Sequence, residues 1–201
     1  VMFSEVYWHH GVRSATAMLQ RAFYLLYDAL ELDALFRMTE APFIAALFAA
    51  AEGNPAKELL DGLFGPTRKL YKRVAQYSYI EQPEIHARLA RKHYPYLAAC
   101  AGQLALVASA ALGKVIAPHE ILLDAPPIER EVEFNVDIYY PKEHRYRPLE
   151  EVSPVVRTLA REQFDDYVKR VRIFAHPRIA RELRERADLP KLLSSALERM
   201  E

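Results

Sequence analysis

The chain has 201 residues, of which 51% are hydrophobic and 27% are charged, a composition that predicts a folded core and excludes an intrinsically disordered protein. Lys and Arg together number 27, as do Asp and Glu, and the resulting net charge of zero argues against a protein whose main task is to coat DNA or an anionic membrane. The single cysteine excludes an intramolecular disulfide framework and a multi-cysteine metal site.

The first ten residues, VMFSEVYWHH, lack the basic segment and apolar run of a signal peptide. The longest stretch of low charge, residues 97–112, is shorter than the ~20 residues that a bilayer requires and contains Gln103. We therefore expect a soluble, cytoplasmic protein with no membrane partner. Because a helical pattern begins almost directly after Val1, we also expect the chain to be cut from a longer protein.

Residues 1–66 carry helical patterns. The first helix is expected from Ser4 to about Glu31, and Thr39 and Pro55 open two further helices that end near Ala51 and Leu63. In the first helix, apolar residues recur at steps of three and four and predict its buried stripe: Val12, Ala15, Leu19, Ala22, Leu26 and Ala29. A second face of the same helix is expected to need another partner, and it carries Tyr7, His10, Ser14 and Arg21.

Residues 67–201 alternate between strand and helix patterns. Strands are expected at 68–80, 120–124, 132–140 and 168–175. Helices are expected at 83–92, 95–112, about 153–165, 177–186 and 190–200. This order is that of a ferredoxin-like βαββαβ module. The predicted fold class is therefore α+β, with a helical segment over 1–66 and, over 67–201, a module on a mixed or antiparallel sheet.

No complete active site can be assembled from the sequence. His9 and His10 are adjacent and would diverge on a helix, and the pattern gives His119, His144 and His176 no partners, so we expect no metal site. Cys100 lies in an Ala-rich helix, where it is expected to be a small buried residue. No glycine-rich phosphate-binding motif or serine nucleophile motif is present.

Three basic clusters lie on or next to expected strands. The first consists of Arg68, Lys69, Lys72 and Arg73, the second of Lys142, Arg145 and Arg147, and the third of Lys169, Arg170 and Arg172. If these strands are neighbours, their outward side chains would converge on one edge of the sheet and could hold a polyphosphate or nucleotide. Solvated strand faces that prevent edge-to-edge aggregation are the alternative interpretation.

Several ordered motifs resemble one enzyme family. These are YWHHGVRSATAMLQRAF, LDALFRMTEAPFIAALF, AKELLDGL and RKLYKRV, followed by VEFNVDIYY, LEEVSPVVRTL and YVKRVRIFA. Together they resemble the region that follows the metal site in HD-superfamily phosphohydrolases of the deoxynucleoside triphosphate triphosphohydrolase type. The resemblance implies an upstream HD domain in the same protein, whose two histidines and two aspartates hold a divalent metal that activates water against a phosphate ester.

The resemblance also implies roles for residues of this chain. Tyr7 matches a substrate-contacting tyrosine, Trp8 replaces the residue at a neighbouring contact, and His10 stands where the family often has Lys or Arg. We expect this segment to complete the wall of a substrate pocket and to support homo-oligomer contacts, without holding metal and without turning over nucleotides by itself. The alternative is a regulatory or interaction module that binds a nucleotide effector or a partner subunit. Nucleic acid is not an expected partner, because the chain carries no net charge.

Overall fold

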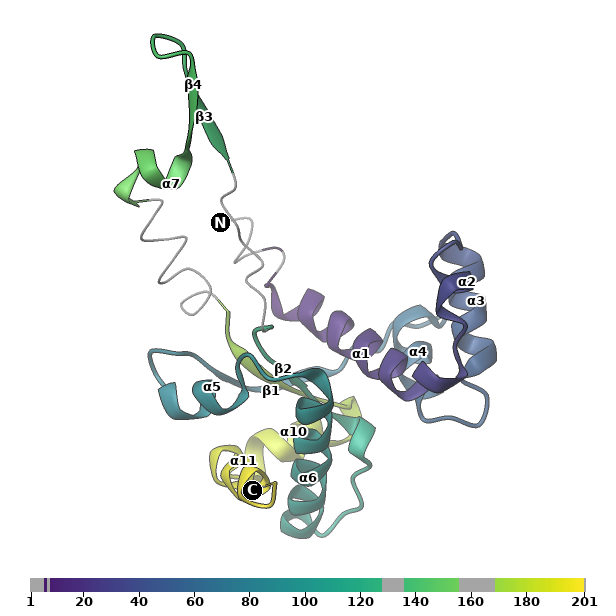
Figure 1. Ribbon diagram of the computed structural model, residues 1–201. Coiled ribbons are helices and arrows are strands. Elements are labelled where there is room, and N and C mark those ends of the chain that lie inside the picture. Colours follow the sequence, from purple (N-terminus) through teal and green to yellow (C-terminus); the bar gives the residue numbers. More distant parts are fainter. Residues whose placement is uncertain (1–5, 7, 128–135, 156–168, 201) are drawn as a thin grey trace. The chain divides into compact units, whose positions relative to one another are not determined.

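The computed structural model describes residues 6, 8–127, 136–155 and 169–200 (Figure 1). The chain forms two compact units. Unit 1 contains residues 1–76, 94–124 and 172–201, and unit 2 contains residues 77–93 and 125–171. The boundary expected at residue 66 stays a prediction, because compactness within one chain does not test where an upstream domain ends.

The first helix, α1 (His10–Leu26), is shorter than expected and turns a different face to the core. It begins at His10 because the Nδ1 atom of His9 accepts the Gly11 N–H at 3.2 Å, and it ends in a 3-10 turn, η2 (Tyr27–Ala29). The predicted stripe is correct at Ala22 and Leu26 but wrong at Val12, which is 46% exposed. The buried residues of the helix are Ser14, Ala17, Met18, Arg21, Ala22 and Leu26.

Two polar residues explain why α1 turns a different face to the core than the apolar stripe predicts. The Ser14 hydroxyl donates to the Tyr71 carbonyl oxygen at 2.7 Å, and the Arg21 guanidinium donates to the Ala98 carbonyl oxygen at 3.4 Å. The Arg21 guanidinium also lies 5.9 Å from the centre of the Tyr94 ring. The face that was expected to need another partner is thus covered, at Ser14 and Arg21, by this chain's own residues. Hydrogen bonds offset the cost of burying these two polar side chains. The spacing of apolar residues alone does not predict their burial.

Three further helices complete the N-terminal part of unit 1. They are α2 (Leu32–Leu35), α3 (Glu40–Ala50) and α4 (Ala56–Phe64), and the last two agree with prediction to within two residues. Helix α4 packs on α1 at Gly62, which lies against the Met18 side chain. The core around this contact also includes Leu26, Leu47, Ala56, Leu59, Leu60, Tyr71, Leu122 and Phe174.

A three-stranded sheet lies at the centre of unit 1, with the strand order β1-β5-β2. Its strands are β1 (Lys72–Tyr77), β2 (Ile121–Asp124) and β5 (Val171–Ala175). Strands β2 and β5 are antiparallel, with Leu122 opposite Phe174. All five residues of β5 are buried, so this strand is covered on both faces.

Helices from the C-terminal half complete unit 1 (Figure 1). They are α6 (Tyr94–Leu112), α10 (Pro177–Arg186) and α11 (Leu189–Glu198), with a 3-10 turn, η3 (Pro118–Glu120), before β2. Of the described helices, α6 is long and apolar enough to cross a membrane, but it packs against α11 and β2, as a core helix does. Cys100 is buried in α6, as predicted.

Unit 2 contains α5 (Pro83–Leu89), a hairpin of β3 (Asp137–Tyr140) and β4 (Arg145–Pro148), and α7 (Leu149–Val152). The hairpin is antiparallel, with Tyr139 opposite Tyr146. The α+β class and the antiparallel pairing are confirmed. The five described strands, however, belong to two sheets rather than to one ferredoxin-like sheet. Most of the helix expected at 153–165 lies outside the described residues.

Candidate functional site

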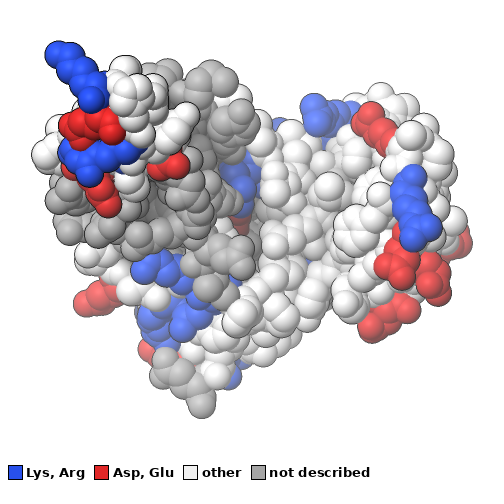
Figure 2. All heavy atoms as spheres, turned by 45° about the horizontal axis from the view of Figure 1, so that its top comes forward, with Lys and Arg blue, Asp and Glu red and all other residues white. Residues whose placement is uncertain are grey.

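A hollow of about 700 Å³ on unit 1 brings together several of the residues selected from the sequence. We call it the basic hollow. Its polar lining comes from three elements: His10 and Ser14 of α1, Lys72, Arg73 and Gln76 of β1, and Arg184 of α10. None of the described residues that line it is acidic. Acidic side chains gather elsewhere on unit 1, around α2 and α3 at the right of Figure 2. The basic hollow is therefore suited to an anion.

His10 lies at the first residue of α1, beside the basic strand. Burial lowers the pKa of its imidazole below the ordinary value of 6.5, and the neighbouring His9, Arg73 and Arg172 lower it further. The rings of His9 and His10 are 4.2 Å apart, because His9 caps the helix instead of continuing it, so the expected divergence of the two side chains is wrong. A bound anion next to this imidazole would raise its pKa and favour its protonation.

Arg73 and Arg184 meet although they are 111 residues apart in the sequence. The Arg184 guanidinium donates to the Arg73 carbonyl oxygen at 3.2 Å, and the Arg73 guanidinium donates to the Gln76 Oε1 atom at 2.9 Å. Arg184 was not predicted from the sequence. It lies in the last turn of α10, where basic residues are common because they complement the helix dipole, and only the packing of α10 beside β1 brings it to the hollow.

Two hydrogen bonds between α1 and the residue before β1 fix the backbone beside the hollow. The Ser14 hydroxyl donates to the Tyr71 carbonyl oxygen, and the Tyr71 N–H donates to the Met18 Sδ atom at 3.4 Å. Tyr71 is only 3% exposed, and its burial raises the pKa of the phenol. Because Lys72 follows directly, this anchor sets where β1 presents its basic side chains.

The other predicted site residues lie elsewhere. Arg68 lines a second, mainly apolar hollow with Val12, Leu19 and Phe64. Lys69 lines a third hollow with Glu58, Asp61 and His176. Tyr7 lies outside the described residues. Of the six residues selected from the sequence, the basic hollow therefore unites His10, Lys72 and Arg73.

The two remaining basic clusters do not form the expected outward-facing edge. Lys169 is completely buried and Arg172 is 6% exposed, so the prediction that the last strand points its basic side chains outward is wrong at both positions. Arg172 is buried because its guanidinium has partners inside the protein, which include the Trp8 carbonyl oxygen. In unit 2, Arg145 and Arg147 both bind Glu143, at 2.6 and 2.5 Å, and so form a local ion-pair cluster.

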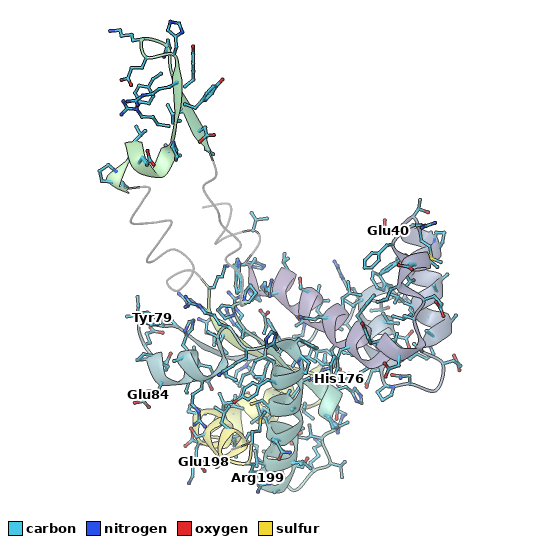
Figure 3. The ribbon with its side chains drawn as sticks, viewed as in Figure 1. Glu40, Tyr79, Glu84, His176, Glu198 and Arg199 are labelled. Atoms are coloured by element: carbon cyan, nitrogen blue, oxygen red, sulfur yellow. The ribbon has the colours of Figure 1, made fainter. Side chains whose placement is uncertain are left out.

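Two histidines that the sequence left isolated share one carboxylate. The Glu58 side chain lies 2.8 Å from His119 Nε2 and 3.3 Å from His176 Nε2, with one carboxylate oxygen facing each ring. His176, labelled in Figure 3, caps α10 through its Nδ1 atom, which accepts the Arg178 N–H at 3.1 Å. This acceptor role places the proton of a neutral His176 on Nε2, facing Glu58.

Next to this pair, the side chain of Arg178 forms a bidentate ion pair with Glu120, at 2.9 and 2.5 Å. Burial by itself would raise the pKa of the Glu120 carboxyl, but hydrogen bonds from Arg178 and from the Ala117 N–H outweigh it and lower that pKa. Within the described part of the chain, no group of three or more His, Cys, Asp or Glu side chains is placed to hold a metal ion.

Comparison with known proteins identifies the family. A family model described as an HD associated region matches residues 1–190. The comparisons with curated proteins and with solved structures each gave no match. The match confirms the inferred relation to HD-domain proteins. Because it extends over nearly all of the 201 residues, the chain belongs to the HD associated region family.

Proposed function

We propose that this chain forms the phosphate-binding wall of an HD-type phosphohydrolase that acts on nucleotides or related phosphate esters. The observation that carries the proposal is the convergence of His10, Lys72, Arg73 and Arg184 on one hollow whose described lining contains no carboxylate. A region that belongs to the HD associated family and gathers cationic side chains in this way is suited to hold the charged part of such a substrate.

The chemistry of the side chains supports a phosphate ligand. Arg73 and Arg184 offer planar guanidinium groups that can bind phosphate oxygens in pairs, and Lys72 offers a mobile point charge. His10 stands at the N-terminus of a 17-residue helix, where the helix dipole favours an anion. With His10 uncharged, the hollow still holds three permanent positive charges.

The resemblance implies a divalent metal in the whole enzyme, where it would activate a water molecule against the phosphate ester. Among the described residues of this chain, no three His, Cys, Asp or Glu side chains are placed together to hold a metal ion. In our proposal the metal ligands belong to the HD domain, while this region binds and orients the phosphate groups.

Binding of inorganic tripolyphosphate to the purified chain tests the proposal. At a ligand concentration of a hundred times Kd, we expect ~2.7 kcal/mol of added stability in thermal unfolding. Isothermal titration calorimetry should give an affinity that falls between 50 and 200 mM salt, because several exposed ion pairs form. Sodium chloride at matched ionic strength is the control. A chain whose unfolding and calorimetric titration do not respond to tripolyphosphate would refute the proposal.

We expect the affinity for tripolyphosphate to rise as the pH falls from 7.5 to 6. The pKa of His10 lies below 6.5 in the free protein, and a bound polyanion raises it, so binding takes up a proton. The measurement is the ratio of the Kd values of wild type and His10→Gln at each pH, because this ratio cancels the titration of the ligand. The ratio should change severalfold over this range. If it stays constant, His10 does not contact the anion.

The effect of His10 on folding stability changes with pH in the opposite direction to its effect on tripolyphosphate affinity. Because the folded-state pKa of His10 is depressed, its contribution to stability is present above pH 6.5 and is lost as the pH falls through the folded pKa. Binding and unfolding therefore have to be measured separately at each pH.

A regulatory module that binds a nucleotide effector is the second candidate function. The observation in its favour is that the described residues that line the basic hollow all belong to unit 1. In a protein that also carries the HD domain, loss of Arg73 should raise KM for every hydrolysed substrate if the hollow binds substrate. If the hollow binds an effector, the same change should remove activation by one nucleotide and leave the unactivated KM unchanged.

A further inference from the structure

In unit 1, Arg13 and Arg172 lie against the only tryptophan of the chain, Trp8, and Asp124 pairs with both arginines. We propose that Asp124, acting through Arg13 and Arg172, is a positioning residue that fixes the segment from Trp8 to His10 and so holds the imidazole of His10 at the basic hollow. The proposal rests on the proposed phosphate site for its functional meaning, although its geometric claim can be tested without a ligand.

Asp124 is the last residue of β2, and its side chain is 2% exposed. Arg13 of α1 binds its carboxylate through two hydrogen bonds, Nε to Oδ2 at 3.0 Å and Nη2 to Oδ1 at 2.5 Å. The Nη1 atom of Arg172, on the neighbouring strand β5, lies 4.0 Å from Oδ2. One carboxylate thus ties the first turn of α1 to two strands of the sheet.

The same two arginines hold Trp8, which is 2% exposed. The guanidinium carbon of Arg13 lies 4.3 Å from the centre of the indole ring, and that of Arg172 lies 5.6 Å from it. Arg172 also donates from Nη2 to the Trp8 carbonyl oxygen at 2.7 Å. Both the ring and the backbone of Trp8 are therefore fixed, two residues before His10.

Electrostatics explain why Asp124 is central to this arrangement. Two guanidinium groups approach one indole ring, and they would repel each other in a buried position without the carboxylate between them. Replacement of Asp124 by Asn keeps the size of the side chain but removes the negative charge. Arg172 should then no longer hold the Trp8 carbonyl in place, and the backbone that leads into His10 should move.

Tryptophan fluorescence, excited at a wavelength that tyrosine does not absorb, tests this directly, because Trp8 is the only tryptophan of the chain. In Asp124→Asn we expect a red-shifted emission as water reaches the indole, together with displaced imidazole resonances of His10 in heteronuclear NMR. The affinity for tripolyphosphate should fall about tenfold, which is the lower end of the loss seen when a metal ligand loses the partner that orients it.

Glu120→Gln is the matched control, since Glu120 is also buried on unit 1 and also binds an arginine through two hydrogen bonds. It should lose stability but keep the wild-type Trp8 emission, His10 resonances and affinity. If Asp124→Asn does not fold, Arg172→Lys provides the second test. It keeps the positive charge but lacks the guanidinium fork, and it should shift the Trp8 emission in the same direction.

The two proposals fail in distinguishable ways. If wild type does not bind tripolyphosphate but Asp124→Asn still shifts the Trp8 emission and the His10 resonances, the positioning role stands and the phosphate site fails. If wild type binds tripolyphosphate and a folded Asp124→Asn matches it in emission, resonances and affinity, the positioning role is overturned. An equal loss of affinity in Glu120→Gln would overturn it as well, because general destabilisation would then explain the effect.

Discussion

Replacing Gly62 by Ala should destabilise the protein by about 1–3 kcal/mol, the usual range for inserting a methyl group into a packed core. A Cβ atom on Gly62 would lie 2.8 Å from the Met18 Cε atom and 2.9 Å from the Lys69 carbonyl oxygen. The Met18 side chain can move, but the Lys69 backbone is tied to Gly62 by an N–H···O bond of 2.8 Å. The added methyl group therefore has to push α4 away from α1 or move the segment that leads into β1.

Gly102→Ala is the control for this prediction. Gly102 also lies inside a helix, but a Cβ atom there would meet only the Pro118 Cβ atom, at an ordinary contact distance of 3.9 Å. The higher helix propensity of Ala should stabilise this variant by up to ~1 kcal/mol. Urea unfolding of both variants measures the difference. If Gly62→Ala is as stable as wild type, α1 and α4 do not pack as closely as the structure indicates.

Charge reversal at Arg73 should weaken tripolyphosphate binding at least tenfold, which is the largest functional effect that we predict. Arg73→Glu removes a guanidinium and places a carboxylate in a hollow whose described lining contains none. Arg184→Glu should act in the same direction, since it also removes the hydrogen bond to the Arg73 carbonyl oxygen. Calorimetry at two salt concentrations should show both the lower affinity and a shallower salt dependence.

Arg68→Glu and Arg181→Glu are the matched controls for charge reversal. Arg68 is an exposed arginine just before β1 that lines a different hollow, and Arg181 lies on the same helix as Arg184 with its side chain 85% exposed. Each control changes the net charge by the same amount as Arg73→Glu. If all four variants lose affinity equally, tripolyphosphate responds to the overall charge of the protein and the basic hollow is not its site.

Local sequence signals sufficed for much of the secondary structure. Thr39 precedes α3, and Pro177 opens a helix with the predicted bounds. The prediction at Pro177 succeeds because a proline fits the first turn of a helix, where its missing N–H would have no partner in the helix. Thr39 marks the start of α3 through its extended backbone, without a hydrogen bond from its side chain. The relation of the chain to HD-domain proteins was likewise predicted from ordered motifs, and the family match confirms it.

The sequence predicted only part of the candidate site. Lys72 and Arg73 are close together in the chain and next to a strand pattern, so their cluster was visible, whereas Arg184 was not. Glu58, whose carboxylate pairs with both His119 and His176, also lies far from them in the sequence, on α4. Nothing in the local sequence of these residues encodes such a meeting, because it depends on how separate elements pack.

The sequence by itself determined that this protein is an α+β chain of the HD associated region family with basic residues around its first strand. Only the tertiary structure decided which of its charges are buried and which face an open hollow. Lys169 and Arg172 lie on or just before β5, the middle strand of its sheet, while Lys72 and Arg73 lie on β1 at the edge of that sheet. The physical reason is that a strand pattern fixes the alternation of side chains, but the neighbours on either side of the strand fix whether those side chains meet water or protein.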